Sequence, residues 1–397
     1  MDAGYLLDWV NLLLRWAHVI TAIAWIGSSF YFVFLDSSLT PPNDPDLQAK
    51  GVNGELWAVH GGGFYHPQKY LVAPRQLPDK LHWFFWESYS TWLTGFALFT
   101  VLYLVNAGSF LVDARVFAWG SNGAAVAAAL GLLFGFWFVY DAIGRLAGVT
   151  RDRMVGSLVA LVVVAMSWAA CQLFAGRAAF LIVGAALATA MSANVLVWII
   201  PGQRKVIAQM RAGQAVDPIH GQRGKQRSVH NTYFTLPVLI AMLSNHYGWL
   251  TGASGNWLAL VALMLAGALI RHSFVARHKA LVQGQRVPWE WAGGGVLLLL
   301  ALVAALAPAP RSAAVALPAP TTAQVQAVVQ QRCVLCHGAE SPQKGVALHS
   351  AALLEQHAAA VYQQVVVEKR MPLNNATGLT EEERLVVGRW FEGRVTK

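Results

Sequence analysis

The sequence has few charged residues and few cysteines. Asp, Glu, Lys and Arg make up only 12% of its 397 residues, whereas 56% are apolar and 16 are tryptophan. Soluble domains carry about 25% charged residues, so this scarcity excludes a wholly soluble chain and indicates a membrane protein. Three cysteines are too few for a disulfide framework, and Cys171 lies alone within an apolar run.

The positive net charge of +9 also needs a physical explanation. A nucleic-acid-binding domain gathers Lys and Arg on one face, but here they form short clusters between long apolar runs. The topology of a membrane protein accounts for that pattern, because cytoplasmic loops collect basic residues. We therefore expect contact with membrane lipid and no nucleic acid partner.

Several apolar runs approach the roughly 20 residues that a helix needs to cross a bilayer. They lie near residues 7–35, 83–106, 117–140, 154–175, 178–200, 231–248, 256–275 and 291–308. The Lys and Arg residues near them fall almost entirely in alternate connections, and the intervening connections hold only Arg115 and Arg177. The sequence therefore predicts an all-α bundle of eight transmembrane helices over residues 1–308, with both termini outside the cytoplasm.

The region behind the last apolar run contains the attachment signature of c-type haem, C-x-x-C-H, at Cys333, Cys336 and His337. We expect the cysteines to form the two thioethers and His337 to be one axial ligand of the iron. Met371, which precedes a proline, is the expected second axial ligand. A zinc site or a redox dithiol is the alternative, and the candidates for a further zinc ligand are His349 and His357.

The whole C-terminal region has the layout of a known fold. A helix, the C-x-x-C-H motif, a Met before Pro, and a closing helix that begins with a capping box at Thr380 and Glu383 resemble a small class I cytochrome c. This domain would occupy residues 321–397, behind a Pro/Ala linker at 309–320. Haem is attached to such motifs on the outer face of a bacterial inner membrane, which agrees with the topology inferred from charge.

Ionisable side chains inside membrane spans are costly and mark candidate functional residues. In the first apolar run, Arg15 and His18 are three residues apart and share a helix face. His18 is either a ligand of a haem b or a buried, hydrogen-bonded histidine that holds helices together, and the sequence leaves both open. Further candidate haem b ligands near span ends are His82, His230, His246 and His272.

The first long connection has an unusual composition. The segment "GELWAVHGGGFYHPQKY", residues 54–70, combines three glycines and several aromatic residues with His60, His66 and Lys69. Glycines let a backbone approach a ligand closely, and the other side chains offer stacking and hydrogen bonds. We predict that the segment forms part of a ligand site. An interfacial re-entrant segment rich in aromatic residues is the alternative.

Four segments together carry a resemblance that covers nearly the whole chain. In this order and followed by the C-x-x-C-H domain, "WAHVITAIAWIGSSFYFVFLD", "GELWAVHGGGFYHPQKY", "LHWFFWESYSTWLTGF" and "HNTYFTLPVLIAMLSNHY" resemble the bacterial membrane-bound urate oxidases (urate hydroxylases). The resemblance implies an inner-membrane oxidoreductase of purine catabolism that converts urate to 5-hydroxyisourate. Its electrons would pass through haem c to a soluble cytochrome c or a terminal oxidase, and not directly to O2.

A site for urate, a planar monoanion near neutral pH, needs a cation, an aromatic surface and a base. Lys69 or Arg15 would bind the anion. The candidate bases are His60, His66 and Glu87, and the candidate stacking residues are Trp57, Tyr65 and Trp83.

A bilayer core of about 30 Å would separate a cytoplasmic urate site from haem c, which is too far for one tunnelling step. We therefore expect a haem b between them, with His18, His230 and His246 as candidate iron ligands. Two other functions also fit the residues. One is an electron relay from quinol to cytochrome c without purine chemistry. The other is a transporter with an appended cytochrome, argued from Arg15 and Asp141 within the membrane.

Overall fold

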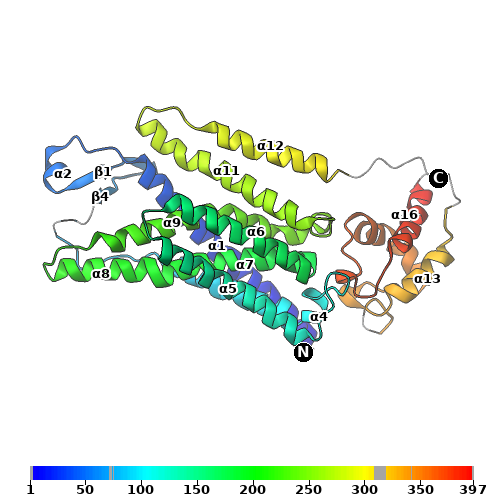
Figure 1. The fold of residues 1–397 in the computed structure, drawn as a ribbon. Helices are drawn as coiled ribbons and strands as arrows, with labels where there is room; N and C mark the ends of the chain where they lie inside the picture. Colours follow the sequence, from blue (N-terminus) through cyan, green and yellow to red (C-terminus); the bar gives the residue numbers. More distant parts are fainter. Residues whose placement is uncertain (1–2, 71–73, 75, 308–318, 341, 396–397) are drawn as a thin grey trace.

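Long apolar helices make up most of this computed structural model, which describes residues 3–70, 74, 76–307, 319–340 and 342–395 (Figure 1). The helices of the N-terminal part are α1 (Ala3–Ser38), α2 (Pro45–Ala49), α3 (Trp86–Phe99), α4 (Ala107–Phe110), α5 (Asn122–Ala147), α6 (Asp152–Leu173), α7 (Gly176–Ala193), α8 (Ile200–Arg211), α9 (Pro218–Leu243), α10 (Gly248–Thr251), α11 (Asn256–Val282) and α12 (Trp289–Ala305). Those of the C-terminal part are α13 (Thr322–Arg332), α14 (Ala351–Gln356), α15 (Ala358–Val361) and α16 (Glu381–Val395). The molecule is 72% helical, which agrees with the predicted all-α class.

Five helices of the described chain are long and apolar enough to cross a membrane. They are α1, α5, α6, the continuous run from α7 through α8, and α11. The remaining predicted spans also fall on helices, but α12 has only 17 residues, α3 has 14 before a π-helical turn at Thr100–Leu104, and α9 has a polar first half. The structure therefore supports a membrane protein, and the total of eight crossings stays a prediction.

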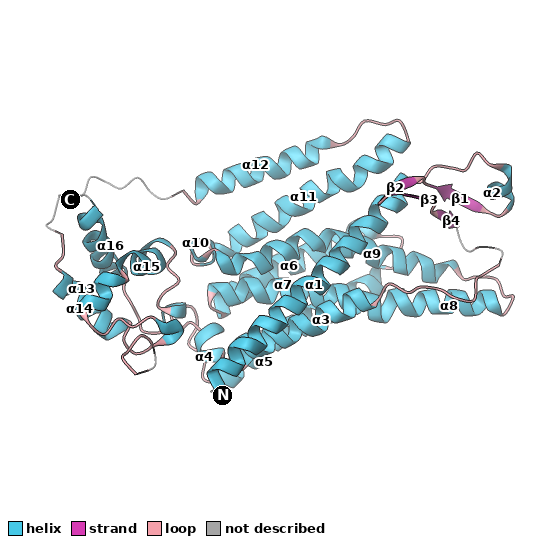
Figure 2. Ribbon diagram, turned by 180° about the vertical axis from the view of Figure 1, so that it is seen from behind, coloured by secondary structure: helices cyan, strands magenta, loops and turns pink. Residues whose placement is uncertain are grey.

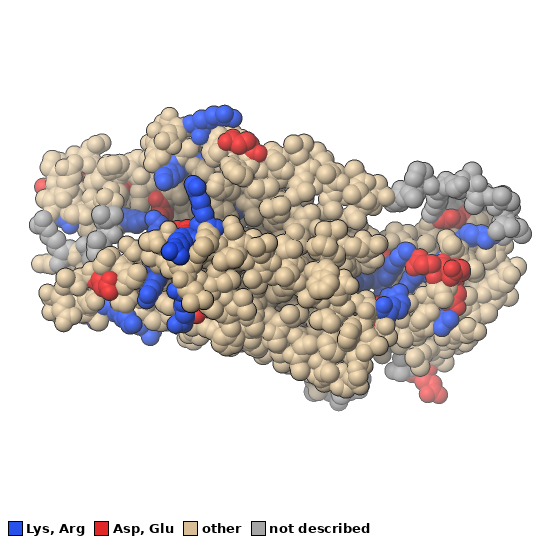
Figure 3. Space-filling view, viewed as in Figure 1, with Lys and Arg blue, Asp and Glu red and all other residues tan. Residues whose placement is uncertain are grey.

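The core of the N-terminal part lies where α5, α6, α7 and α9 pack together. Small residues on α7 allow close approach: a Cβ added at Gly184 would stand 2.7 Å from the Cβ of Ala241 on α9. The outer helices instead expose large apolar side chains such as Leu12, Ile23 and Leu297. Figure 3 shows Lys and Arg gathered towards both ends of the molecule, with a largely uncharged surface between them. This is the pattern of a bilayer-spanning surface.

The segment at residues 54–70 forms strands, which the all-α prediction did not include. Strand β1 (Val52–Glu55) pairs with β4 (Gln68–Tyr70), and β2 (Ala58–His60) pairs with β3 (Gly63–Tyr65), in antiparallel pairs. Gly61 and Gly62 connect β2 to β3 with φ angles of +58° and +81°, a conformation that two consecutive glycines adopt without a steric penalty. The strands lie at the same end of the molecule as α8 (Figures 1 and 2).

The C-terminal part packs around its own apolar core, which includes Val325, Val329, Leu354 and Trp390. The capping box predicted at Thr380 and Glu383 is present: the Glu383 N–H donates to Thr380 Oγ1 at 3.2 Å, and the Thr380 N–H donates to Glu383 Oε2 at 2.8 Å. Of the linker predicted at 309–320, residues 309–318 lie outside the described chain. The division into domains stays a prediction.

The C-terminal part lies at the end of the helices opposite the strands (Figure 1). Its Lys344 Nζ contacts Asp8 Oδ1 on α1 at 2.8 Å, and the Arg370 guanidinium donates to the carbonyl of His246. The two ends of the helices therefore have different neighbours. One end carries the strands, and the other carries the C-x-x-C-H region.

Candidate functional site

A cavity of about 900 Å³ lies at the strand-bearing end of the helices. Its wall combines α1, β4, the start of α3, the α7–α8 run, α9 and α11. Both apolar and polar side chains line it, as is usual for small-molecule sites. The residues that matter for its chemistry are Asp36, Lys69, Trp83, Glu87, Lys225 and Asn231.

Two lysines supply positive charge to this cavity. Lys69, on β4, forms an ion pair with Asp36 at the end of α1. Lys225 is on α9, and it lines the same cavity. Partial burial, together with the nearby Lys225 ammonium, lowers the pKa of Lys69 from its ordinary value. The lining thus carries two ammonium groups, Lys69 and Lys225, and two carboxylates, Asp36 and Glu87. The ammonium groups are the part of the wall that can bind an anion.

Glu87 lines the cavity and has a carboxylate oxygen that accepts no hydrogen bond from the described residues. It lies in the first turn of α3, where the helix dipole favours a negative charge. Its Oε2 atom is buried and has no hydrogen-bond partner among the residues that the structure describes. A buried oxygen without a hydrogen bond lowers the stability of the protein unless a ligand or a water donates a hydrogen bond to it. Glu87 is therefore placed to accept a hydrogen bond or a proton from a molecule in the cavity.

The predicted catalytic residues separate into two groups. Lys69 and Glu87 line the cavity, whereas His60 and His66 do not. His66 Nε2 is 2.5 Å from Glu55 Oε2, and its ring stacks on Trp57 with centroids 4.0 Å apart. His60 is exposed at the end of β2.

The other residues predicted for anion binding and stacking are also divided. Trp83 lines the cavity, and Trp57 and Tyr65 belong to the exposed strand region. Arg15 lies on α1 and donates to Asn11 Oδ1 at 3.3 Å, away from the cavity lining. Sequence reasoning missed Asp36, Lys225 and Asn231 as cavity residues.

His18 connects two helices. Its Nδ1–H donates to the carbonyl of Thr91 at 3.1 Å and lies 3.2 Å from Thr94 Oγ1, both on α3. Its ring packs directly against Gly95, where an added Cβ would stand 2.7 Å from Cε1. These contacts hold the ring in place, and they leave Nε2 as the nitrogen that is able to bind a metal. Both sequence interpretations of His18 remain open.

The other candidate histidines have different partners. His230 Nδ1 is hydrogen-bonded to the Tyr140 hydroxyl at 2.9 Å, and His272 Nδ1 to the Tyr233 hydroxyl at 2.7 Å. His82 packs edge-on against Phe84. His230 lies on α9, which ends at Leu243, and His246 belongs to the 3₁₀ turn that follows it. No group of three or more metal-binding side chains occurs among the residues described.

Asp141, the acid on which the transporter alternative depends, is fully engaged by neighbours. Its carboxylate accepts from Arg145 Nε at 2.6 Å, Arg227 Nη2 at 2.8 Å and Trp198 Nε1 at 2.6 Å. Such a network fixes helix ends and leaves no carboxylate oxygen free to carry a proton. Asp141 and Arg145, four residues apart on α5, also form an ion pair.

Contacts with neighbouring groups hold the side chains of the C-x-x-C-H region in place. The His337 Nδ1–H donates to the carbonyl of Val346 at 2.8 Å, which orients the ring and leaves Nε2 as a ligand atom. Cys333 and Met371 pack against the same apolar core. The loop that carries Met371 is fixed by Arg384, whose guanidinium donates to the Met371 carbonyl at 2.8 Å. Both thiols, of Cys333 and Cys336, are free of disulfides.

Comparison with known proteins adds one match. A family model described as urate oxidase N-terminal matches residues 4–307, which is well over half of the chain. Searches of curated proteins and of solved structures found no match. The matched range contains α1, except its first residue, and all of α2 to α12 and the cavity, and it ends before the C-x-x-C-H region. On this evidence the chain belongs to the urate oxidase family, through its N-terminal part.

Proposed function

We propose that the chain is a membrane-bound urate oxidase, or urate hydroxylase, which converts urate to 5-hydroxyisourate in the cavity. Membership of the family supports the substrate. The observation that carries the proposal is the composition of the cavity, which combines Lys69 and Lys225 with the unsatisfied carboxylate of Glu87. These are the groups that binding and deprotonating a planar anion require.

Each group has a separate role in this proposal. Lys69 and Lys225 offset the charge of the urate monoanion, and Trp83 offers a surface for stacking. Addition of one water to urate, with loss of two electrons and two protons, gives 5-hydroxyisourate. Glu87 Oε2 accepts one of these protons, from the substrate or from the attacking water. Asn231 also lines this wall, where its amide is held by hydrogen bonds to Asn194 and the Met191 carbonyl.

The electrons leave through the C-terminal region in this proposal. Cys333, Cys336, His337 and Met371 would hold haem c, which supplies a one-electron carrier with a raised reduction potential. His337 and Met371 are held by contacts to Val346 and Arg384, as a fixed ligand pair requires. A soluble cytochrome c or a terminal oxidase then takes the electrons, so no hydrogen peroxide forms.

A haem b between the cavity and haem c would complete the route. Along α3, Thr91 is four residues and Gly95 eight residues beyond Glu87, so His18 lies roughly 6 to 12 Å further along the helix from the cavity. His18, with His230 or His246, is the proposed source of iron ligands. This position shortens the distance that each electron must cover.

The proposed topology has eight transmembrane helices over residues 1–308, the linker at 309–320 and a cytochrome c domain at 321–397. It is a multi-pass protein of the bacterial inner membrane, with both termini in the periplasm. The cavity then opens towards the cytoplasm, where purine breakdown supplies urate. The excess of Lys and Arg around the strand-bearing end supports this orientation (Figure 3).

Purified protein tests the activity directly. We expect urate consumption when a one-electron acceptor such as ferricyanide replaces O2, with formation of 5-hydroxyisourate and no hydrogen peroxide. The change Glu87→Gln removes the proposed base, and the exposed Glu290→Gln, on α12, is the matched control. Unchanged turnover in Glu87→Gln, or no urate consumption by the parent protein with any acceptor, would overturn the proposal.

A further inference from the structure

The C-terminal part packs closely against the helices of the N-terminal part. A Cβ added at Gly248, at the start of α10, would stand 2.4 Å from the carbonyl oxygen of Glu368 and 3.0 Å from Arg177 Nη2. The neighbouring Arg370 guanidinium donates to the carbonyl of His246. Only glycine permits so close an approach of the two backbones. The contact therefore involves the segment directly before Met371.

A second, small cavity of about 80 Å³ lies within this contact. Five basic side chains line it, and they come from both parts of the molecule: Arg115, Arg177, Lys369, Arg370 and Arg384. Its volume is roughly that of two or three water molecules in the liquid. The space therefore suits a small group.

The charges around this cavity are unbalanced. Arg115 pairs with Asp113 at 2.7 Å, Arg370 with Glu368 at 2.8 Å, and Lys369 with Glu381 at 2.7 Å, while Arg384 shares Glu381 at 3.4 Å. Five cations thus share three carboxylates. Arg177 has no ion pair with any residue in the described ranges.

The backbone adds a further positive contribution. Helix α7 begins at Gly176, which lines the small cavity, and its N-cap residue, Ala175, makes no side-chain capping bond. The first N–H groups of a helix have no partner within the helix, and they carry the positive end of its dipole. Helix α7 has 18 residues, which is long enough for its dipole to place a full partial positive charge at its N-terminus. The cations and the helix end together favour an anion.

We propose that this cavity binds an oxyanion, the phosphate of a lipid headgroup or inorganic phosphate, which bridges the helices and the C-terminal part. The anion would offset the repulsion of Arg177 against Arg370 and Lys369. A lipid source is natural, because Arg177 lies in the first turn of α7, next to the short connection from α6, and both helices are long and apolar enough to span a membrane. This site lies at the end of the molecule away from the proposed urate cavity, and it does not depend on urate chemistry.

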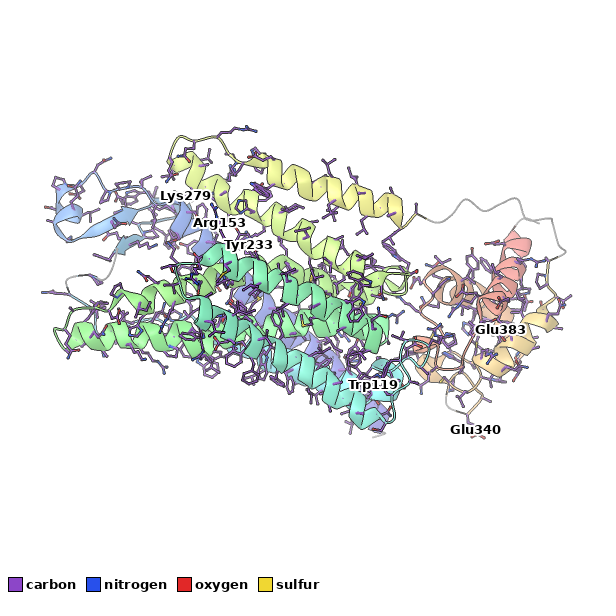
Figure 4. The ribbon with its side chains drawn as sticks, viewed as in Figure 1. Trp119, Arg153, Tyr233, Lys279, Glu340 and Glu383 are labelled. Carbon is purple, nitrogen blue, oxygen red and sulfur yellow. The ribbon has the colours of Figure 1, made fainter. Side chains whose placement is uncertain are left out.

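The test measures thermal unfolding of the full-length protein in detergent, after lipid has been washed out. Inorganic phosphate, compared with chloride at equal ionic strength, raises the unfolding midpoint of the parent protein. Arg177→Gln raises the phosphate concentration needed for half of that shift at least about tenfold. Arg153→Gln and Lys279→Gln change basic residues at the other end of the molecule and leave the response intact (Figure 4). If Arg177→Gln does not fold, Lys369→Gln replaces it.

A second arm identifies the source of the phosphate. If a lipid headgroup is the natural occupant, phosphatidylglycerol added to the detergent raises the midpoint and abolishes the response to phosphate. If inorganic phosphate is the occupant, the response persists in the presence of lipid. Absence of any shift with either compound, or an equal shift in the parent and Arg177→Gln, overturns the proposal.

A second measurement follows the contact between the C-terminal part and α1. Asp8→Cys with Lys344→Cys places one thiol on each side of this contact, where a bifunctional maleimide with a spacer can join them. Phosphate or lipid accelerates this cross-linking in the parent background at least about threefold, and does so less in Arg177→Gln. An identical rate with and without both compounds contradicts a bridging anion.

Discussion

His18 on α1 and Gly95 on α3 are in contact so close that a Cβ at residue 95 would stand 2.7 Å from His18 Cε1. The same ring is hydrogen-bonded to the Thr91 carbonyl. The two helices are therefore joined by a fixed imidazole at a point between the cavity and the C-terminal part. Changes at His18 or Gly95 therefore test the proposed electron route.

We predict that His18→Ala and Gly95→Val both remove a b-type haem. Dithionite-reduced spectra should lose the b-type band and keep the c-type band, because Cys333, Cys336 and His337 are untouched. Thr21→Val, on the same helix and hydrogen-bonded to Thr94, is the control and should keep both bands. A parent spectrum with no b-type band would show that His18 is a structural histidine.

Glu87→Gln should lower kcat about 10²- to 10⁴-fold, the range that positioned acid–base groups supply. KM for urate should change little, because the amide keeps the shape of the side chain. Steady-state rates with ferricyanide measure both constants. A large rise in KM with unchanged kcat would assign Glu87 to binding and leave the base unidentified.

The pH dependence of urate binding should follow Lys69. A lysine is a cation below its pKa, and the pKa of Lys69 is lower than usual because of partial burial and Lys225. KM should therefore rise with increasing pH as the ammonium loses its proton, at a pH below that of an ordinary lysine. Lys69→Arg should remove this rise, because guanidinium stays charged. The same rise in both proteins would exclude Lys69 as its cause.

Changing His60 distinguishes the cavity from the strands as the place of the reaction. His60 is exposed and does not line the cavity, so His60→Ala should keep kcat within about twofold of the parent value. His66→Ala loses the contact with Glu55 and the stacking on Trp57, and it should lower thermal stability more than activity. A loss of turnover in His60→Ala, with haem spectra unchanged, would place the chemistry in the strand region.

The helices were readable from the sequence because they rest on a strong local signal. The long apolar runs predict helices, since an isolated segment in a bilayer satisfies its backbone hydrogen bonds only as a helix. The C-x-x-C-H spacing predicts haem attachment without any knowledge of the fold, and this stays a prediction. The cavity was only partly predictable, because its wall comes from distant segments such as Asp36 and Asn231.

The part of the site on α9 was missed for an identifiable reason. Lys225 appeared to lie in a basic loop, but α9 begins at Pro218 and carries it into the cavity wall. A signal was available: Asp217 caps the helix by accepting from the Ile219 N–H at 2.9 Å, and Pro218 occupies the first turn. Similarly, Gly61 and Gly62 are the residues that a tight hairpin turn favours.

The most direct test is anaerobic addition of urate to the purified, air-oxidised protein, with the visible spectrum recorded over time. The account predicts reduction of haem c by urate alone, preceded or accompanied by bands of a b-type haem. Glu87→Gln should slow this reduction, while ascorbate still reduces haem c. If haem c stays oxidised with urate and is reduced by a quinol, the chain is an electron relay and the proposed urate chemistry is wrong.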